Sequence, residues 1–357
     1  YRTMRFRMKK TKILLLLSLT LLGTSCSKFQ GEDEKNNMIN FKDTKNICLG
    51  RIEFTVPKET DVKFGTFSFD GSDFEIVEDV TTLDQYDQFI KDKIENLKKQ
   101  QHETEGSLLK FEKMGSLKLN QRSISHIIVY RPTEYTDGLF FIDAFIYLNR
   151  KLIRMKSPVD TDKLMDGLRR TENIIQNFKL KSSKGPNQAG LCWKDYFIAD
   201  DMTENRFFLS KAYLSFPSYP EVTMNIENRA RVESDTPLIQ MIQKNREQIP
   251  EELKKVFKVS DIRSSVREIN GLKGEEVMTH YQQRLSFGRG FESGAWQYLG
   301  TLDDPTDSYI YLGLESVDEV NNKALNAPLN QKIVLGLNDF ILNNIKISAF
   351  NQGKSND

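Results

Sequence analysis

The sequence predicts an α+β protein made of two tandem lobes, each a mainly antiparallel sheet with packed helices. Short segments in which apolar and polar residues alternate are typical of half-buried strands, and longer segments carry one apolar stripe at helical spacing. These elements occur in the same order in residues 47–180 and 190–350, as an internal duplication produces. The polar segment 181–189 between them carries Gly185 and Pro186 and is expected to be a linker.

The first lobe, residues 47–180, opens with a strand in which Ile52, Phe54 and Val56 alternate with polar residues before Pro57 ends it. Further strand is indicated by Phe64, Phe67 and Phe69. The remaining elements expected here are a helix at about 82–101, strands at about 124–130, 139–148 and 151–155, and a closing helix at about 161–178.

The second lobe, residues 190–350, repeats this order. We expect strands near 192–198, 207–216 and 222–228, a helix at about 235–257, strands at about 262–269, 275–284, 295–301 and 308–314, and a closing helix at about 329–345. The approach to the middle strands is also similar, with Gly115 to Lys118 in one half and Gly271 to Gly274 in the other.

Residues 1–25 are expected to be a signal peptide. Basic residues from Arg5 to Lys12 precede an apolar run from Ile13 to Leu22, which is too short for the roughly 20 residues that span a bilayer. The small residues before Cys26 resemble the lipobox of bacterial lipoproteins, in which the cysteine becomes the lipidated first residue. Gly23 departs from the aliphatic residue of that pattern, so an ordinary signal peptide cut near Ser25 is the alternative.

The segment after the signal peptide is expected to tether the folded part to a membrane. Ser27 stands where an aspartate would resemble an inner-membrane retention signal, so we expect a lipoprotein of the outer membrane that faces the periplasm. Residues 26–46 are polar and without periodicity, and residues 351–357 form a short tail. Without residues 1–25 the chain has 45 Lys and Arg against 50 Asp and Glu, a net charge of −5. No basic stripe suggests a nucleic-acid partner.

Two further cysteines, Cys48 and Cys192, each lie at the start of a folded half. Export places them in an oxidising compartment, where they can form a disulfide. The alternative is that each is a small buried apolar residue and that the two never meet.

The sequence lacks the motifs of the common enzyme classes, so we expect no catalysis, no metal site and no cofactor. His102 ends a charged helix and is expected to be solvated, while His126 and His280 lie in strands without ligand spacing. There is no nucleophile elbow and no Walker sequence. The acidic groups at 303–307 and 160–162 are interpreted as a hairpin loop and a helix N-cap, respectively.

Two strand-joining loops in equivalent places are the candidate recognition sites. Each combines aromatic residues with arginine, the residue types that dominate interface hot spots. The candidate partner-binding residues are Arg131, Tyr135, Phe287, Arg289, Phe291 and Trp296. The alternative is that these aromatic residues complete the core of each lobe.

Three short motifs resemble one protein family. Cys48-Leu-Gly-Arg followed by a strand and Pro57 is similar to the N-terminal domain of immunity proteins that protect bacteria from type VI secretion phospholipase effectors. Gly190-Leu-Cys192 and the segment from Ile269 to Glu276 are similar to the C-terminal domain of that family, although Trp193-Lys-Asp departs from its pattern.

The resemblance implies a periplasmic protein whose two lobes hold a lipase toxin inactive, by covering its active site or by preventing the opening of its lid. The alternative function is an outer-membrane lipoprotein that serves as an assembly or ligand-binding module. An envelope enzyme with an unfamiliar site is a third possibility.

Overall fold

The computed structural model describes residues 43–116, 124–182, 188–283, 290–316, 319–320, 323–324 and 331–348. The predicted signal peptide, Cys26 with most of the tether, and the tail lie outside these ranges, so the structure does not bear on those predictions. In the ranges described, no helix is both long enough and apolar enough to cross a membrane.

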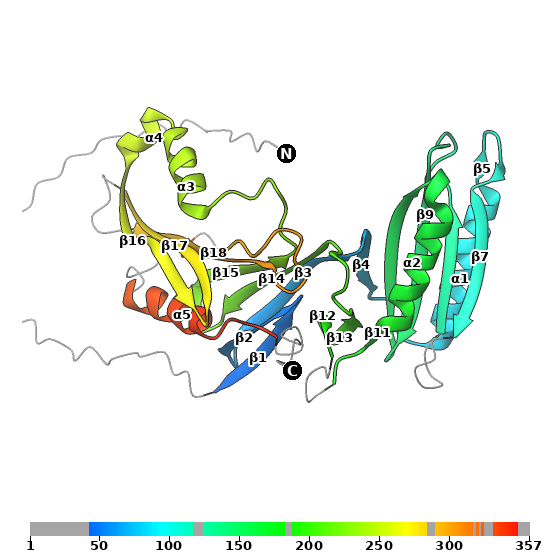
Figure 1. Cartoon of the computed structure of the whole chain (residues 1–357), viewed down its shortest axis with the longest axis horizontal. Coiled ribbons are helices and arrows are strands. Elements are labelled where there is room, and N and C mark those ends of the chain that lie inside the picture. Colours follow the sequence, from blue (N-terminus) through cyan, green and yellow to red (C-terminus); the bar gives the residue numbers. More distant parts are fainter. Residues whose placement is uncertain are drawn as a thin grey trace, which may run out of the picture. The chain divides into compact units, whose positions relative to one another are not determined.

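The first half contains eleven strands, two α-helices and one short 3-10 helix within the described ranges (Figure 1). They are β1 (Thr44–Leu49), β2 (Ile52–Pro57), β3 (Asp61–Phe69), β4 (Ser72–Val77), α1 (Leu83–Lys99), β5 (Gln101–His102), β6 (Gly106–Ser107), β7 (Leu109–Ser116), β8 (Ile124–Tyr130), β9 (Leu139–Leu148), β10 (Lys151–Asp160), the 3-10 helix η1 (Thr161–Lys163), α2 (Leu164–Asn177) and β11 (Phe178–Leu180).

The second half follows the same order, with its first helix divided in two. Its described elements are β12 (Gly190–Trp193), β13 (Tyr196–Ala199), β14 (Phe208–Phe216), β15 (Tyr219–Arg229), α3 (Leu238–Glu247), α4 (Glu251–Val256), β16 (Phe257–Ile269), β17 (Leu272–Gln283), β18 (Gly290–Tyr298), β19 (Tyr309–Ser316), β20 (Glu319–Val320), β21 (Lys323–Ala324), α5 (Gln331–Asn343) and β22 (Lys346–Ile347).

One sheet runs through both halves, and its strand order shows the duplication. Among the described residues it has 12 strands in the order β16-β17-β18-β19-β15-β14-β3-β4-β10-β9-β8-β7. The six strands from β16 to β14 belong to the second half of the chain, and the six from β7 to β3, read from the other end, belong to the first half in the equivalent order. The two halves meet where β3 pairs with β14 antiparallel. The predicted fold class, α+β in two lobes, is confirmed, and the two lobes share this sheet.

The two halves exchange their opening hairpins. Leu49, Ile52, Phe54 and Val56 of the hairpin β1–β2 lie in a core whose other members come from the second half, and β22 pairs with β2. Conversely, the hairpin β12–β13 packs into the core of the first half, and β11 pairs with β13. Each core therefore needs a hairpin from the other half, and the linker at 181–189 does not separate two self-contained cores.

Helices cover both faces of each lobe. On one face α2 packs on the strands β8 to β10, and α5 packs on β14, β15, β18 and β19. On the other face α1 packs on β8 to β10, and α3 packs on β17 to β19. Figure 1 shows α1 and α2 on opposite sides of the first lobe's strands.

The sequence predicts α1 correctly, but it misses the division of the helix at 235–257 and the strand β7. Thr82 begins α1 with a capping box, in which Gln85 N donates to Thr82 Oγ1 over 3.2 Å and Thr82 N donates to Gln85 Oε1 over 3.1 Å. The helix predicted at 235–257 is instead α3 and α4, divided at Pro250, because proline has no N–H for the helix interior. The sequence pattern also missed β7, an edge strand with mostly exposed side chains.

Candidate partner-binding surface

Arg131 supports a loop, which corrects its expected role as a partner contact. The side chain is only 3% exposed, and its guanidinium lies 3.6 Å from the centre of the Phe140 ring. It donates to Leu139 O over 3.2 Å and to Thr161 Oγ1 over 3.0 Å. Tyr135, by contrast, is 71% exposed on the same loop and remains available to a partner.

Trp296 is also a core residue, which corrects the second expected contact. It is fully buried, and its indole Nε1 donates to Arg267 O over 3.2 Å. Phe291 is partly exposed and stacks on Tyr281 with the ring centres 4.9 Å apart. Phe287 and Arg289 lie outside the described residues. Aromatic residues and arginine are used in cores as well as in interfaces, so their presence in a loop did not separate the two roles.

His102 is buried, so the prediction that it is solvated was wrong. It is 4% exposed, because the chain turns back after α1 into the small hairpin β5–β6. Its Nδ1 accepts from Glu105 N over 3.3 Å, which closes that turn.

Within the described ranges, His280, Glu292 and Ser316 lie together, but not in the arrangement of a serine hydrolase. His280 Nδ1 lies 3.0 Å from Glu292 Oε1, and Ser316 Oγ donates to Glu292 Oε2 over 3.0 Å. The carboxylate lies between the other two groups, whereas in a Ser-His-Asp triad the imidazole itself contacts the hydroxyl and takes its proton. In the part of the chain that the structure describes, no group of His, Cys, Asp and Glu side chains is arranged to hold a metal ion.

The two acidic segments differ in the contacts that their side chains make. In the turn at 301–307, Asp307 accepts from Tyr298 Oη over 2.7 Å and from Thr301 Oγ1 over 2.6 Å. Asp160 precedes η1, but its side chain makes no capping hydrogen bond, so the predicted N-cap is not formed.

A disulfide joins the two exchanged hairpins. Cys48 of β1 and Cys192 of β12 are bonded, with their Cα atoms 5.6 Å apart. Next to it, the backbones of Gly50 and Cys192 exchange two hydrogen bonds of 2.9 and 2.8 Å. Gly50 has a φ of 56°, and a Cβ there would lie 2.4 Å from Asn228 Oδ1, so this position requires glycine.

A buried ion pair completes this junction. Arg51 Nη2 lies 2.8 Å from Asp200 Oδ2, and the two side chains are 1% and 0% exposed. Burial lowers the pKa of Arg51 to about 10, against the opposing effect of Asp200, so the guanidinium stays charged at neutral pH. Asp200 also pairs with Arg206. The junction therefore fixes one half of the chain to the other by covalent, ionic and backbone bonds.

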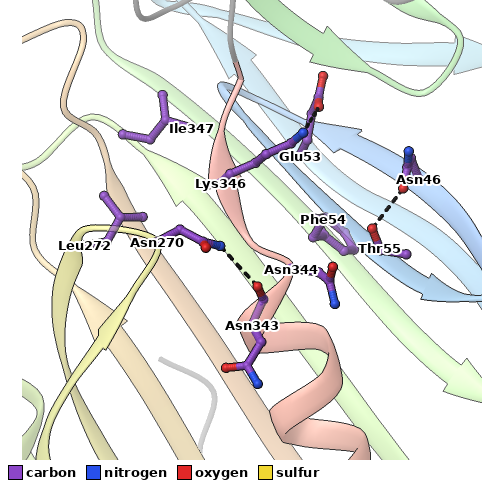
Figure 2. A pocket seen from close by; sticks show the side chains of 10 residues that line it. All are labelled: Asn46, Glu53, Phe54, Thr55, Asn270, Leu272, Asn343, Asn344, Lys346 and Ile347. Atoms are coloured by element: carbon purple, nitrogen blue, oxygen red, sulfur yellow. Dashed lines mark hydrogen bonds and ion pairs between the residues drawn. The ribbon is translucent and has the colours of Figure 1, made fainter. Parts of the chain in front are cut away.

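A cavity of ≈480 Å³ lies where the hairpin β1–β2 meets the end of α5 (Figure 2). Figure 2 shows that Asn270 donates to the backbone oxygen of Asn343, over 3.1 Å, and that Thr55 donates to Asn46 Oδ1, over 2.8 Å. Its polar lining thus holds α5 to the β16–β17 turn and β1 to β2.

The middle of the sheet has one open face. On β14 the residues Ala212 and Leu214 lie in the core, so Tyr213 and Ser215 point to the opposite face. That face carries α3 over Val277 and Ala295, and the same cross-strand row continues through Gly313, Asn225 and Tyr213 to Lys63. The next row is formed by Glu315, Thr223, Ser215 and Asp61.

We name seven exposed residues of these two rows the central patch. They are Asp61, Lys63, Tyr213, Ser215, Thr223, Asn225 and Glu315, and they come from the four adjacent strands β3, β14, β15 and β19. None of the seven side chains forms a hydrogen bond or an ion pair with another described residue.

The neighbouring row differs, because its charges are paired within the chain. Glu227 pairs with Lys211 at 2.7 Å and with Arg229 at 2.8 Å, and Arg229 also pairs with Asp235. Burial raises the pKa of Asp235, but hydrogen bonds from Arg229 and from the N–H of Val232 outweigh it, and the pKa is lowered. The open face thus has a row of residues joined in ion pairs with each other, next to the central patch, whose side chains have no such partner among the described residues.

Comparison with known proteins identifies two domains. Residues 45–180 match the N-terminal domain, and residues 184–348 the C-terminal domain, of a family described as Tle cognate immunity protein 4. No curated protein sequence matches the chain.

Solved structures share the fold. The crystal structure of a Tle4–Tli4 complex contains a chain that is 16% identical, with a TM-score of 0.73, over 87% of this chain and 99% of that one. The apo structure of the immunity protein TplEi of the T6SS from Pseudomonas aeruginosa is also 16% identical, with a TM-score of 0.71, over 85% and 97%. TplEi complexed with an "L" peptide is 14% identical, with a TM-score of 0.67, over 86% and 99%.

Proposed function

This chain belongs to the Tle cognate immunity protein 4 family and is a type VI secretion effector immunity protein, and on that premise we propose that it binds a lipase-type effector and holds it inactive between its two lobes. The family predicted from the sequence motifs is thereby confirmed. The inhibitory mechanism that we propose is obstruction, either of the active-site mouth or of the lid movement that a lipase needs.

The observation that carries this proposal is that the two lobes are fastened to each other within the chain. Each core contains the other half's hairpin, and the disulfide Cys48–Cys192 and the pair Arg51–Asp200 fasten the two hairpins together. A receptor that is ordered before it binds loses little conformational entropy in the complex. Such a protein can hold a lipase in one conformation without any chemistry of its own.

We further propose that the protein acts in the periplasm, as an outer-membrane lipoprotein attached through Cys26. The basic and apolar segments before Cys26 support export, and a phospholipase that attacks membranes from the periplasmic side would have to be met there.

Two measurements test these proposals. The purified mature chain should form a stoichiometric complex with the lipase effector encoded beside its gene and should abolish that effector's lipase activity. Cells that express the effector in the periplasm should survive with the full chain and die when residues 1–25 are deleted. A mature chain that leaves the lipase fully active would refute the proposed function. An envelope defect in a deletion strain without any effector would favour the alternative, an assembly or ligand-binding lipoprotein.

A further inference from the structure

We infer that the central patch is a docking surface for the effector, and that the segment it receives is a polar protein segment carrying lysine or arginine. This inference rests on the proposed function and specifies which surface of the immunity protein makes contact. Four features of the patch support it.

The first feature is that none of the helices in the described ranges packs on this part of the sheet. In the row that runs through Asn225, Tyr213 and Lys63, α3 covers Val277 and Ala295 but reaches no further. Tyr213 is 49% exposed in the middle of the sheet. The opposite face of the same strands is fully packed, so the fold's own stability does not require this face to be covered.

The second feature is that the polar side chains of the patch form no hydrogen bond or ion pair with another described residue. The neighbouring Lys211, Glu227 and Arg229 are joined in ion pairs, whereas none of the seven patch side chains has such a partner among the described residues. Their hydrogen-bonding capacity is therefore available to another molecule, and no internal bond must break before they bind.

The third feature is a residue composition suited to binding a protein. Tyrosine, serine and asparagine are enriched in antibody binding sites, because tyrosine supplies rigid contact area and the short polar residues adapt their hydrogen bonds. Here Tyr213 lies against Gly65, where an added Cβ would be 2.8 Å from its ring, and Asn225 lies against Gly313. Both side chains are therefore held close to the backbone before binding.

The fourth feature is charge. Asp61 and Glu315 stand at the two ends of the row that contains Ser215 and Thr223, about 15 Å apart across four strands, and Lys63 is the one cation of the patch. Glu59 and Glu221 lie at the same end of the sheet. The pKa of Tyr219 is raised there, mainly by burial and to a smaller extent by the negative charges of Glu59 and Glu221. This surface would repel nucleic acid and anionic lipid, and it is too polar for an apolar membrane surface, so a basic protein segment is the occupant that fits.

The test uses the mature chain and its lipase effector, with binding measured by calorimetry and inhibition by lipase assay. Tyr213→Ala and the double variant Asp61→Lys with Glu315→Lys should each weaken binding about tenfold or more. The effect of the charge reversal should shrink as salt is added, because exposed charges are screened. The matched controls are Phe111→Ala, an exposed aromatic residue of β7, and Glu95→Lys, an exposed carboxylate of α1, and both should bind like the wild type.

A second measurement does not depend on the stability of these variants. The thiol of Ser215→Cys should react with a maleimide in the free protein and be protected by the effector, whereas the thiol of Ser264→Cys, exposed on β16, should react in both states. If the wild type inhibits the lipase while the patch variants bind normally and Ser215→Cys stays reactive in the complex, the docking inference is wrong and the proposed function stands. If the wild type does not bind the lipase, both fall.

Discussion

The two faces of the strands β14 and β15 differ in the burial and in the bonding of their side chains. Residues alternate one by one along these strands, so that Leu214 and Met224 are buried while Tyr213 and Asn225 are exposed. The buried face packs against a hairpin from the other half of the chain. The open face carries the central patch, whose side chains form no hydrogen bond or ion pair with another described residue. The comparison teaches that, because successive side chains of a strand point to opposite faces, one face can stabilise the fold while the other face is available to bind a partner.

The largest expected effect comes from the buried face. Phe54 is contributed by the first half but is 1% exposed in the core of the second. Phe54→Ala should lower the free energy of unfolding by about 3–5 kcal/mol, because it leaves a cavity in that core. Urea unfolding measures this. Phe111→Ala, at a position 42% exposed, should change the same quantity by less than about 1 kcal/mol. Equal effects of the two substitutions would contradict the hairpin exchange.

The buried ion pair should be nearly as sensitive. Asp200→Asn leaves the Arg51 guanidinium buried without its counter-charge, and we expect a loss of about 3–5 kcal/mol in urea unfolding. Asp201→Asn is the control, since the Asp201 side chain is 64% exposed and its loss should be small. A stable Asp200→Asn protein would show that the pair does not hold the junction together.

The disulfide comes next. Cys48→Ser should lower the free energy of unfolding by about 2–5 kcal/mol, because the bond closes a loop with a sequence separation of 144. Reductant should bring the wild type to the level of the variant and should not affect the variant itself. If reductant leaves the wild type unchanged, the two cysteines are not bonded in solution.

The hairpin exchange marks the limit of prediction from the sequence. The alternation in 207–216 and 275–284 and the apolar stripes of the helices are local, so most strands and both closing helices could be predicted to within a few residues. Which core a hairpin joins is decided by packing across the whole chain. Neither Cys48 nor Gly50 carries a local signal that the segment belongs with the second half.

The candidate site was predictable only in part. A strand at 207–216 with Leu214 buried implies that Tyr213 points the other way. The sequence does not show that the helix at 238–247 covers Val277 and Ala295 in the same cross-strand row but does not reach Tyr213. The sequence suggests Arg131 and Trp296 as partner contacts because their residue types suit interfaces, but the structure shows that their contacts are internal.

The paired row of the open face should respond to acid. The pKa of Asp235 is lowered in the folded chain, so its stabilising contribution is present above its unfolded pKa, near 3.8, and is lost as the pH falls through the folded value. Asp235→Asn should therefore lower the melting temperature at pH 7, and the difference from the wild type should shrink below about pH 4. A difference that is constant from pH 7 to pH 3 would mean that the ion pair with Arg229 contributes nothing.

The smallest expected effect is also the sharpest test of the comparison. Tyr213→Ala should change the free energy of unfolding by no more than about 0.5 kcal/mol, because the side chain lies on the open face and makes no hydrogen bond within the part of the chain that the structure describes. Leu214→Ala, one residue further along the same strand, should lower it by about 2–5 kcal/mol, because Leu214 is 1% exposed in the core. Urea unfolding of the two variants side by side measures the contrast. If Tyr213→Ala proves as destabilising as Leu214→Ala, the open face is part of the protein's own core, and its tyrosine is not free for a partner.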